Sequence, residues 1–186
     1  MLVSSPKLPV TSVKELIAFA KSRPGQLSYS SGGSGSTLHL SAELFKSLAG
    51  INILHVPYKS GGAGMLDLLG GRVEVMFPVA AAAIPHEKTG RLRLLAVTSA
   101  EPSPLAPGVP SIATSGVPGY EAEVLHAMFA PAKTPSAIVN KLNAEVSRYL
   151  RSAPAREVFL KAGIEPSPST PEELVEIINA EVARLA

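Results

Sequence analysis

The sequence contains no cysteine among its 186 residues. Disulfide bonds, zinc–thiolate sites, iron–sulfur clusters and thiol catalysis are therefore excluded together. Aspartate is almost as scarce, since Asp67 is the only one in the chain. The four histidines lie in separate predicted elements and show neither HxH nor HExxH spacing. We therefore expect no metal site, no cofactor and no catalytic pair of carboxylates.

Clusters of one charge and long hydrophobic runs are missing as well. The 17 basic and 15 acidic residues are spread along the chain and leave a net charge of +2, which disfavours nucleic-acid binding. No apolar run approaches the roughly 20 residues that span a bilayer. The first residues lack the charged and apolar regions of a signal peptide. With 46% apolar and 17% charged residues, the composition is that of a globular chain.

Short strands and helices alternate over the first hundred residues. Apolar spacing predicts strands near 26–29, 51–58, 72–77 and 92–98, separated by helices that begin at Ser12, Thr37, Gly61 and Ala80. Ser12 and Glu15 have the spacing of a capping box, and Gly50 is placed to end the helix that begins at Thr37. The alternation predicts an α/β fold with a parallel sheet.

The composition changes at Ala100. Five prolines within residues 101–119 predict an extended crossing segment rather than a packed element, and residues 121–130 are expected to form a strand. Three helices should follow: one begins with Thr134 as N-cap and Pro135 at N1, one spans 154–162, and one begins with a capping box at Thr170. We therefore expect an α/β domain at 1–100 and a crossover segment with a helical part at 101–186.

Residues 29–40 read YSSGGSGSTLHL and join a predicted strand to a predicted helix. The loop is no P-loop, because Gly35 stands where the lysine before Ser36 would be. The dinucleotide pattern GxGxxG fails at Leu38. The nucleophile pattern GxSxG around Ser34 fails because its last position is Ser36.

A physical property of this loop survives those tests. A glycine-rich turn exposes successive backbone N–H groups, and the start of the following helix adds about half a positive charge. The serine and threonine hydroxyls add donors without charge, which favours a carboxylate over a polyphosphate. The alternative is an ordinary tight connection between a strand and a helix.

A second Gly/Ser loop follows the next strand, in the segment HVPYKSGG at 55–62, beside Tyr58 and Lys59. Two such loops at the carboxyl ends of neighbouring strands fit the rule for ligand crevices in open α/β sheets. A simply solvated Lys59 is the alternative. Because His39 lies one helical turn beyond Ser36, a hydrolase that uses Ser34 or Ser36 with His39 is a further alternative. An ordinary amphipathic position for His39 competes with it.

Five segments, in this order and spacing, resemble the Bug or TctC family, the extracytoplasmic solute receptors of tripartite tricarboxylate transporters. They are YSSGGSGSTLHLSAELF, HVPYKSGGAGMLDLLGGRVEVMF, AIPHEKTGRLRLLAVTS, LAPGVPSIATSGVPGYEA and FAPAKTPSAIVNKLNAEV. The resemblance implies a two-lobed receptor, periplasmic-binding-protein type II-like, that closes on a small organic carboxylate with backbone amides, hydroxyls and water. It also implies a periplasmic location, membrane transporter subunits as partners and no enzymatic activity.

The resemblance also implies which residues contact the ligand. By position, the second-lobe loop of the family falls on a run of small residues with a histidine in the helix behind it: Ser31, Gly33, Ser34, Gly35, Ser36, Thr37 and His39. The HVPY loop falls on Tyr58 and Lys59 and forms a wall of the same cleft. After the RVEVMF strand the family commonly has Asp or Asn, and this chain has Pro78, which removes a side-chain ligand but is still expected to lie at the ligand site. Leu125 and Ala127 replace a Trp and a Gly of the family pattern.

Relative to the family, the chain is expected to be N-terminally truncated. Family members begin with a signal sequence and the first half of lobe 1, including a Pro-aromatic-x-x-Gly-Gly loop that forms the opposite jaw. Residues 1–100 would then be the second lobe, and 101–186 the remainder of lobe 1. Ligand binding is expected to be weak, because one jaw leaves much of the ligand in water. The alternative function is a non-transport interaction module that forms a homo-oligomer through the C-terminal part.

Overall fold

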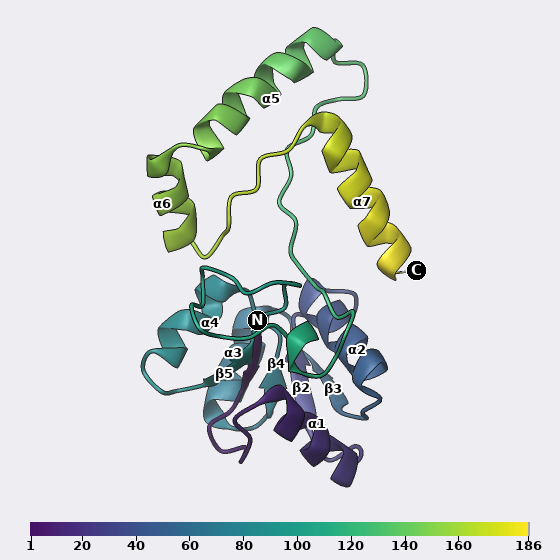
Figure 1. The fold of residues 1–186 in the computed structure, drawn as a ribbon. Coiled ribbons are helices and arrows are strands. Elements are labelled where there is room, and N and C mark those ends of the chain that lie inside the picture. The colour runs from purple at the N-terminus through teal and green to yellow at the C-terminus, as the bar shows by residue number, and fades with distance from the viewer. Residues whose placement is uncertain (186) are drawn as a thin grey trace. The chain divides into compact units, whose positions relative to one another are not determined.

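The computed structural model describes residues 1–185, with side chains to residue 183. The chain divides into two compact units, Met1–Leu125 and His126–Ala186. Unit 1 alternates strands with helices (Figure 1), and its elements are β1 (Leu2–Ser4), α1 (Val13–Ser22), β2 (Ser28–Ser31), α2 (Thr37–Ala49), β3 (Leu54–Pro57), α3 (Gly61–Gly70), β4 (Val75–Met76), α4 (Ala80–Glu87), β5 (Arg93–Ala96) and the 3-10 helix η1 (Ala113–Ser115).

The five strands form one mixed sheet in the order β3-β2-β4-β1-β5. β2 pairs in parallel with both β3 and β4, which confirms the predicted parallel sheet for these three strands. β1 pairs antiparallel with β4 and with β5. The sequence did not predict β1, because a fully buried strand of three residues is too short to show a periodic pattern.

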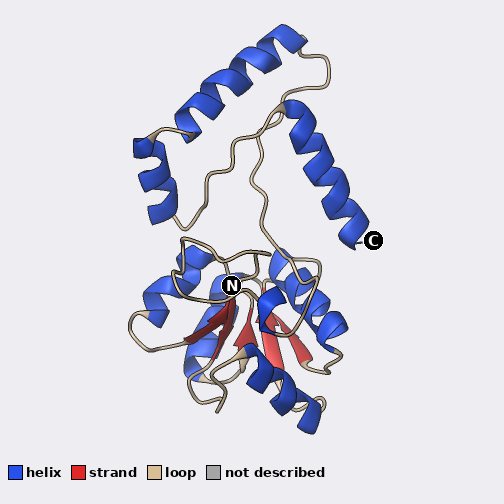
Figure 2. Ribbon diagram, in the orientation of Figure 1, coloured by secondary structure: helices blue, strands red, loops and turns tan. Residues whose placement is uncertain are grey.

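Helices cover both faces of the sheet (Figure 2). The core on the α1 and α2 side includes Leu16, Tyr29 and Phe45, all fully buried. The core on the α3 and α4 side includes Met65 and Leu68. This sandwich confirms the α/β fold class, and the alternation of side chains along β2 sends Tyr29 to one core and the next residue to the other.

Serine side chains cap the first three helices, of which the sequence predicted the cap at Ser12. Ser12, Ser36 and Ser60 each accept a hydrogen bond from the backbone N–H three residues later, at 3.2 to 3.3 Å. The carboxylate of Glu15 accepts from the N–H of Thr11 at 2.6 Å, one residue before the amide that the capping-box pattern predicts. These caps set where α1, α2 and α3 start.

The proline-rich segment 101–119 is packed, so the prediction of an extended crossing segment was wrong. Ile112, Val117 and Tyr120 are buried in the core on the α1 and α2 side. Ile112 also donates its N–H to the carbonyl of Val97, at 3.0 Å. The prolines restrict the local backbone, but apolar side chains between them still reach the core because burial outweighs local composition.

The prediction of a strand at 121–130 was also wrong. The N–H of Ala122 donates to the carbonyl of Thr98 at 2.9 Å, but the structure assigns no strand to this segment. Residues 123–130 are exposed. A β-strand requires a neighbour for its ladder of hydrogen bonds, and none of the described residues provides one here.

Unit 2 consists of the helices α5 (Ser136–Leu150), α6 (Ala153–Lys161) and α7 (Pro171–Leu185). The capping box at α7 is confirmed, since Thr170 Oγ1 accepts from the N–H of Glu173 at 3.1 Å and the Glu173 carboxylate accepts from the N–H of Thr170 at 2.8 Å. The start of α5 differs from the prediction, because Pro135 and not Thr134 is its N-cap.

Candidate functional site

Three helix N-termini gather at one edge of the sheet. Because β2, β3 and β4 are parallel, their carboxyl ends lie at the same edge. Each strand is followed by a short loop and then by the first turn of α2, α3 or α4 (Figure 1). Helix N-termini carry unpaired N–H groups and a partial positive charge, so this edge favours negative charge.

The Gly/Ser loop between β2 and α2 is a closed turn. Gly33 and Gly35 have φ of 110° and 77°, a region that side chains rarely adopt. Ser31 Oγ accepts from the N–H of Gly33 at 3.1 Å, and Ser36 Oγ donates to the Gly33 carbonyl at 2.7 Å. The serines therefore bond to their own loop, which fixes the direction of its peptide groups.

The second Gly/Ser loop packs directly against the first. A Cβ atom on Gly32 would lie 3.2 Å from the nitrogen of Gly61, and one on Gly33 would lie 3.5 Å from the carbonyl oxygen of Tyr58. The space at Gly32 is therefore tight, whereas at Gly33 it is the φ of 110° that favours glycine. The contact places the N-terminus of α3 beside that of α2, as the two-loop pattern of the sequence predicts.

Several backbone donors at this edge have no acceptor within the described part of the chain. The N–H groups of Ser34, Thr37 and Gly61 are among them. Ser34 and Thr37 are exposed, as is Lys59 in the second loop. The edge thus offers neutral donors with a single lysine nearby, a set suited to one small anion.

Two of the residues predicted for the ligand site point elsewhere. The Tyr58 hydroxyl donates to the carboxylate of Asp67 in α3 at 2.6 Å, and Asp67 also pairs with Arg72. Burial and this hydrogen bond raise the pKa of Tyr58 to about 12. Pro78 is buried, and its carbonyl accepts from the backbone nitrogen of Met1 at 2.8 Å.

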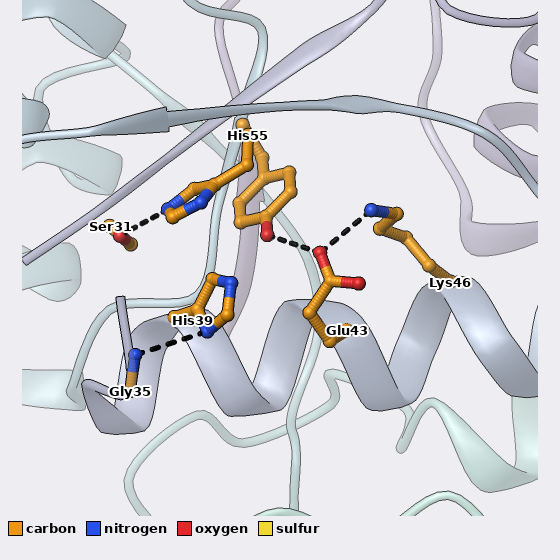
Figure 3. Close-up of polar contacts among 7 residues, drawn as sticks. Ser31, Gly35, His39, Glu43, Lys46 and His55 are labelled. Atoms are coloured by element: carbon orange, nitrogen blue, oxygen red, sulfur yellow. Dashed lines mark hydrogen bonds and ion pairs between the residues drawn. The ribbon is translucent and has the colours of Figure 1, made fainter. Parts of the chain in front are cut away.

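A stack of rings lies under the Gly/Ser loop (Figure 3). Nε2 of His55 lies 2.6 Å from Ser31 Oγ, and Nδ1 of His39 accepts from the N–H of Gly35 at 3.3 Å. The two imidazole centroids are 4.3 Å apart, and His55 stacks on Tyr29 at 4.9 Å. His55 was not among the site residues expected from the sequence. Its one available signal was its place in the strand paired with β2, in register with Tyr29.

The same stack continues to an ion pair on α2. The Tyr29 hydroxyl donates to Glu43 at 2.5 Å, and the ammonium of Lys46 pairs with the same oxygen at 2.7 Å. Partial burial alone would raise the pKa of Glu43, but the hydrogen bonds from Lys46 and Tyr29 outweigh it and hold that pKa below its usual value. Burial lowers the pKa of His55, and the neighbouring His39 lowers it further.

The structure does not place the serine–histidine pair of a hydrolase where the sequence suggested. Ser36 Oγ donates to the Gly33 carbonyl and accepts from the N–H of His39. Neither it nor the hydroxyl of Ser34 bonds to an imidazole in the described structure. Ser31, which does contact an imidazole, is fully buried.

The described residues contain no group of three or more His, Asp or Glu side chains placed to hold a metal ion. A cavity of about 310 Å³, lined by Lys7, Arg23 and Glu74 among others, lies at the amino-terminal ends of β2 and β4. The candidate site is therefore the edge formed by the two Gly/Ser loops.

Comparison with known proteins places the chain in a receptor family. The sequence model described as "Tripartite tricarboxylate transporter family receptor" matches residues 1–186. Protein BugT of Bordetella pertussis is 36% identical over 186 residues, which are 100% of this chain and 57% of BugT. A UPF0065 protein from the tcbD-tcbE intergenic region of Pseudomonas sp. (strain P51) is 34% identical over 173 residues, 92% of this chain and 52% of its own. The chain thus spans a little more than half the length of these curated relatives.

Solved structures agree with the sequence comparison. R. palustris Rpa4515 with adipate superposes with a TM-score of 0.87 at 40% identity, covering 99% of this chain and 62% of that one. MatC (Rpa3494) from Rhodopseudomonas palustris with bound malate superposes with a TM-score of 0.79 at 27% identity, covering 100% of this chain and 64% of that one. The periplasmic binding protein BugD superposes with a TM-score of 0.81 at 28% identity, covering 99% of this chain and 62% of that one.

Proposed function

Since the chain belongs to the family of tripartite tricarboxylate transporter receptors, we propose that the edge formed by its two Gly/Ser loops binds one end of a small organic carboxylate. The observation that carries the proposal is the convergence of three helix N-termini on loops that hold unpaired N–H donors. The donors are neutral, so they can solvate a carboxylate without the arginine or metal that a polyphosphate needs.

The ligand contacts are proposed from the same loops. Donors come from the backbone of Ser34, Thr37 and Gly61, with the Ser34 and Thr37 hydroxyls beside them. Lys59 supplies long-range attraction. Ser31, Gly33, Gly35, Ser36 and His39 shape the loop, while the Tyr58 ring supports the second loop from behind and Pro78 ends the neighbouring strand. This division refines the set expected from the sequence.

The class of ligand is proposed from the relatives. Two solved neighbours are described with adipate and with malate, which are both aliphatic dicarboxylates. Adipate is the first probe, because the protein seen with it is 40% identical to this chain. We expect weak binding, since the loops of unit 1 leave most of such a ligand exposed to water.

The wider role follows the family. Because Ile112, Val117 and Tyr120 pack in the core of unit 1, we propose that residues 1–125, rather than the 1–100 expected from the sequence, correspond to the second lobe and the remainder to the first. We also propose that the receptor works in the periplasm and that membrane subunits of a transporter receive its solute. Among the described residues, no helix has the length and apolar character needed to cross a bilayer.

Calorimetry with adipate tests the site, and position 37 offers a matched pair of variants. Thr37 is the first residue of α2, where proline is tolerated, and Ser36 already has φ −67° and ψ 157°, the conformation preferred before proline. Thr37→Pro removes one N–H donor, whereas Thr37→Ala removes only the hydroxyl. We expect Thr37→Pro to weaken adipate binding about tenfold, the cost of one charge-assisted hydrogen bond. No heat with adipate, malate or any other carboxylate would contradict the function.

A second proposal concerns unit 2 and rests on the exposed apolar surface of α5. Large apolar side chains of α5 are half exposed at Ile138, at Leu142 one turn later and at Tyr149 two turns after that. We propose that this face packs against a second copy of the chain, which gives a homo-oligomer. Light scattering should then show a dimer mass that Leu142→Glu reduces to the monomer mass. A monomer at every concentration would contradict self-association.

A further inference from the structure

We infer that His39 and His55 are positioning residues that hold the Gly/Ser loop in its anion-binding shape, His55 through the hydroxyl of Ser31 and His39 through the amide of Gly35. The inference rests on the proposed carboxylate-binding function and deepens it. Neither imidazole needs to touch the ligand for this role.

His55 acts on the loop through a buried hydroxyl. The parallel register places His55 opposite Tyr29, so the imidazole lies on the same face of the sheet as the side chain of Ser31, two residues further on. Ser31 Oγ lies 2.6 Å from Nε2 of His55, accepts from the N–H of Gly33 at 3.1 Å and lies 3.2 Å from its carbonyl oxygen. One hydroxyl thus connects the imidazole to both peptide groups of Gly33, whose positive φ forms the turn.

His39 acts on the other side of the turn. Its Nδ1 accepts the N–H of Gly35 at 3.3 Å, which turns this amide toward the imidazole and leaves the N–H groups of Ser34 and Thr37 for the ligand. Only an imidazole that is unprotonated at Nδ1 can accept this bond. The Gly35 N–H therefore donates its hydrogen bond within the protein and is not a ligand contact.

Ring contacts and hydrogen bonds hold the two imidazoles in place (Figure 3). His39 lies against His55, His55 lies flat on Tyr29 with 14° between the rings, and the Tyr29 hydroxyl is held by Glu43. Lys46 pairs with Glu43 and sits 5.5 Å above the Tyr29 ring. The charged groups around the imidazoles are thus one carboxylate and one ammonium on α2. Side chains held on both sides keep their rotamers, which a positioning role requires.

The amide resonances of Gly33 and Gly35 test the inference without any ligand. His39→Phe keeps a ring in the stack but removes the acceptor of the Gly35 N–H, so the amide proton of Gly35 should move upfield. His55→Phe keeps the contact with Tyr29 but removes the nitrogen that contacts Ser31, so the Gly33 amide should shift. His126→Phe, at an exposed position of unit 2, is the control and should change neither amide.

Adipate binding supplies the second readout. We expect His55→Phe to weaken adipate binding about tenfold, His55→Gln, which retains a polar group for Ser31, to recover part of it, and His126→Phe to have no effect. If the wild-type chain binds no carboxylate, the proposed function fails, and the amide shifts still decide whether the imidazoles hold the loop. Should His55→Phe not fold, the His39→Phe and His55→Gln variants provide the test. A Gly35 amide unchanged in folded His39→Phe, or unchanged adipate binding in folded His55→Phe, would overturn the inference.

Discussion

Gly64 of α3 packs directly against Ser30 of β2. A Cβ atom at position 64 would lie 2.9 Å from the Cβ of Ser30 and 3.0 Å from its hydroxyl oxygen. The helix therefore approaches the sheet more closely than any side chain would allow. This approach brings α3, with its N-terminus and the second Gly/Ser loop, to the edge that α2 also reaches.

Gly64→Ala should destabilise the protein by about 1–3 kcal/mol, the usual cost of overpacking a core. The added methyl group meets a strand residue, which can move only with the sheet. Gly62→Ala, in the same helix, is the control, because its Cβ would have only the Ser60 hydroxyl near it, at 3.9 Å. Urea unfolding monitored by circular dichroism gives both values. Equal free energies of unfolding for wild type and Gly64→Ala would contradict the close packing.

Ser30→Ala is expected to leave stability unchanged or to raise it by up to about 1 kcal/mol. The Ser30 hydroxyl is buried and has no hydrogen-bond partner in the described structure. Alanine therefore removes a polar group that loses its hydrogen bonds to water on folding and gains none in the protein. Ser31→Ala is the matched comparison on the next residue. It should cost about 1–3 kcal/mol, because it leaves the His55 nitrogen and the Gly33 amide unpaired. If urea unfolding showed that Ser30→Ala lowers the free energy of unfolding and Ser31→Ala does not, these roles of the two hydroxyls would be refuted.

Stability should fall as the pH drops below 6.5, and His55 should be one cause. Burial beside His39 lowers the pKa of His55 from its ordinary value of 6.5. Between the folded and the unfolded pKa the unfolded chain binds more protons, so the free energy of unfolding decreases with decreasing pH across that window. The full stability is present above pH 6.5. Urea midpoints at pH 5 and pH 7.5 should differ more in the wild type than in His55→Gln, and equal differences would count against the prediction.

The two threonines ahead of the unit 2 helices should behave differently. Thr170→Ala removes the side-chain cap of α7 and should destabilise that helix by about 1 kcal/mol. Thr134→Ala should have little effect, because the N-cap of α5 is Pro135. Hydrogen exchange of the first amides in each helix measures both effects. Faster exchange in α5 after Thr134→Ala would show that the capping predicted from the sequence is correct after all.

Local patterns accounted for the features that the sequence predicted well. The cap at Ser12, the capping box at Thr170 and the C-cap at Gly50, with φ of 61°, depend on neighbours within four residues, so a pattern of residue types reveals them. The succession of a strand, a Gly/Ser loop and a helix could be predicted for the same reason, whereas the role of these loops as a site stays a prediction.

Pairings between distant segments accounted for the errors. The strand β1 and the burial of Ile112 and Tyr120 depend on contacts with residues far along the chain. Residues 121–130 have strand-like composition, but a strand also requires a partner. Proline content likewise described the local backbone of 101–119 and not the packing of the apolar residues between the prolines.

The sequence by itself thus determined the helices, the caps at Ser12, Gly50 and Thr170, the α/β class and the presence of a Gly/Ser loop between a strand and a helix, because each depends on residues a few positions apart. Only the tertiary structure showed that Ser31 bonds to His55, 24 positions later in the chain, and that His39 binds an amide of the loop instead of a serine hydroxyl. The parallel register of β2 and β3 decides the first contact. The second joins residues only four positions apart, but it also requires the folded conformation of Gly35, with φ of 77°.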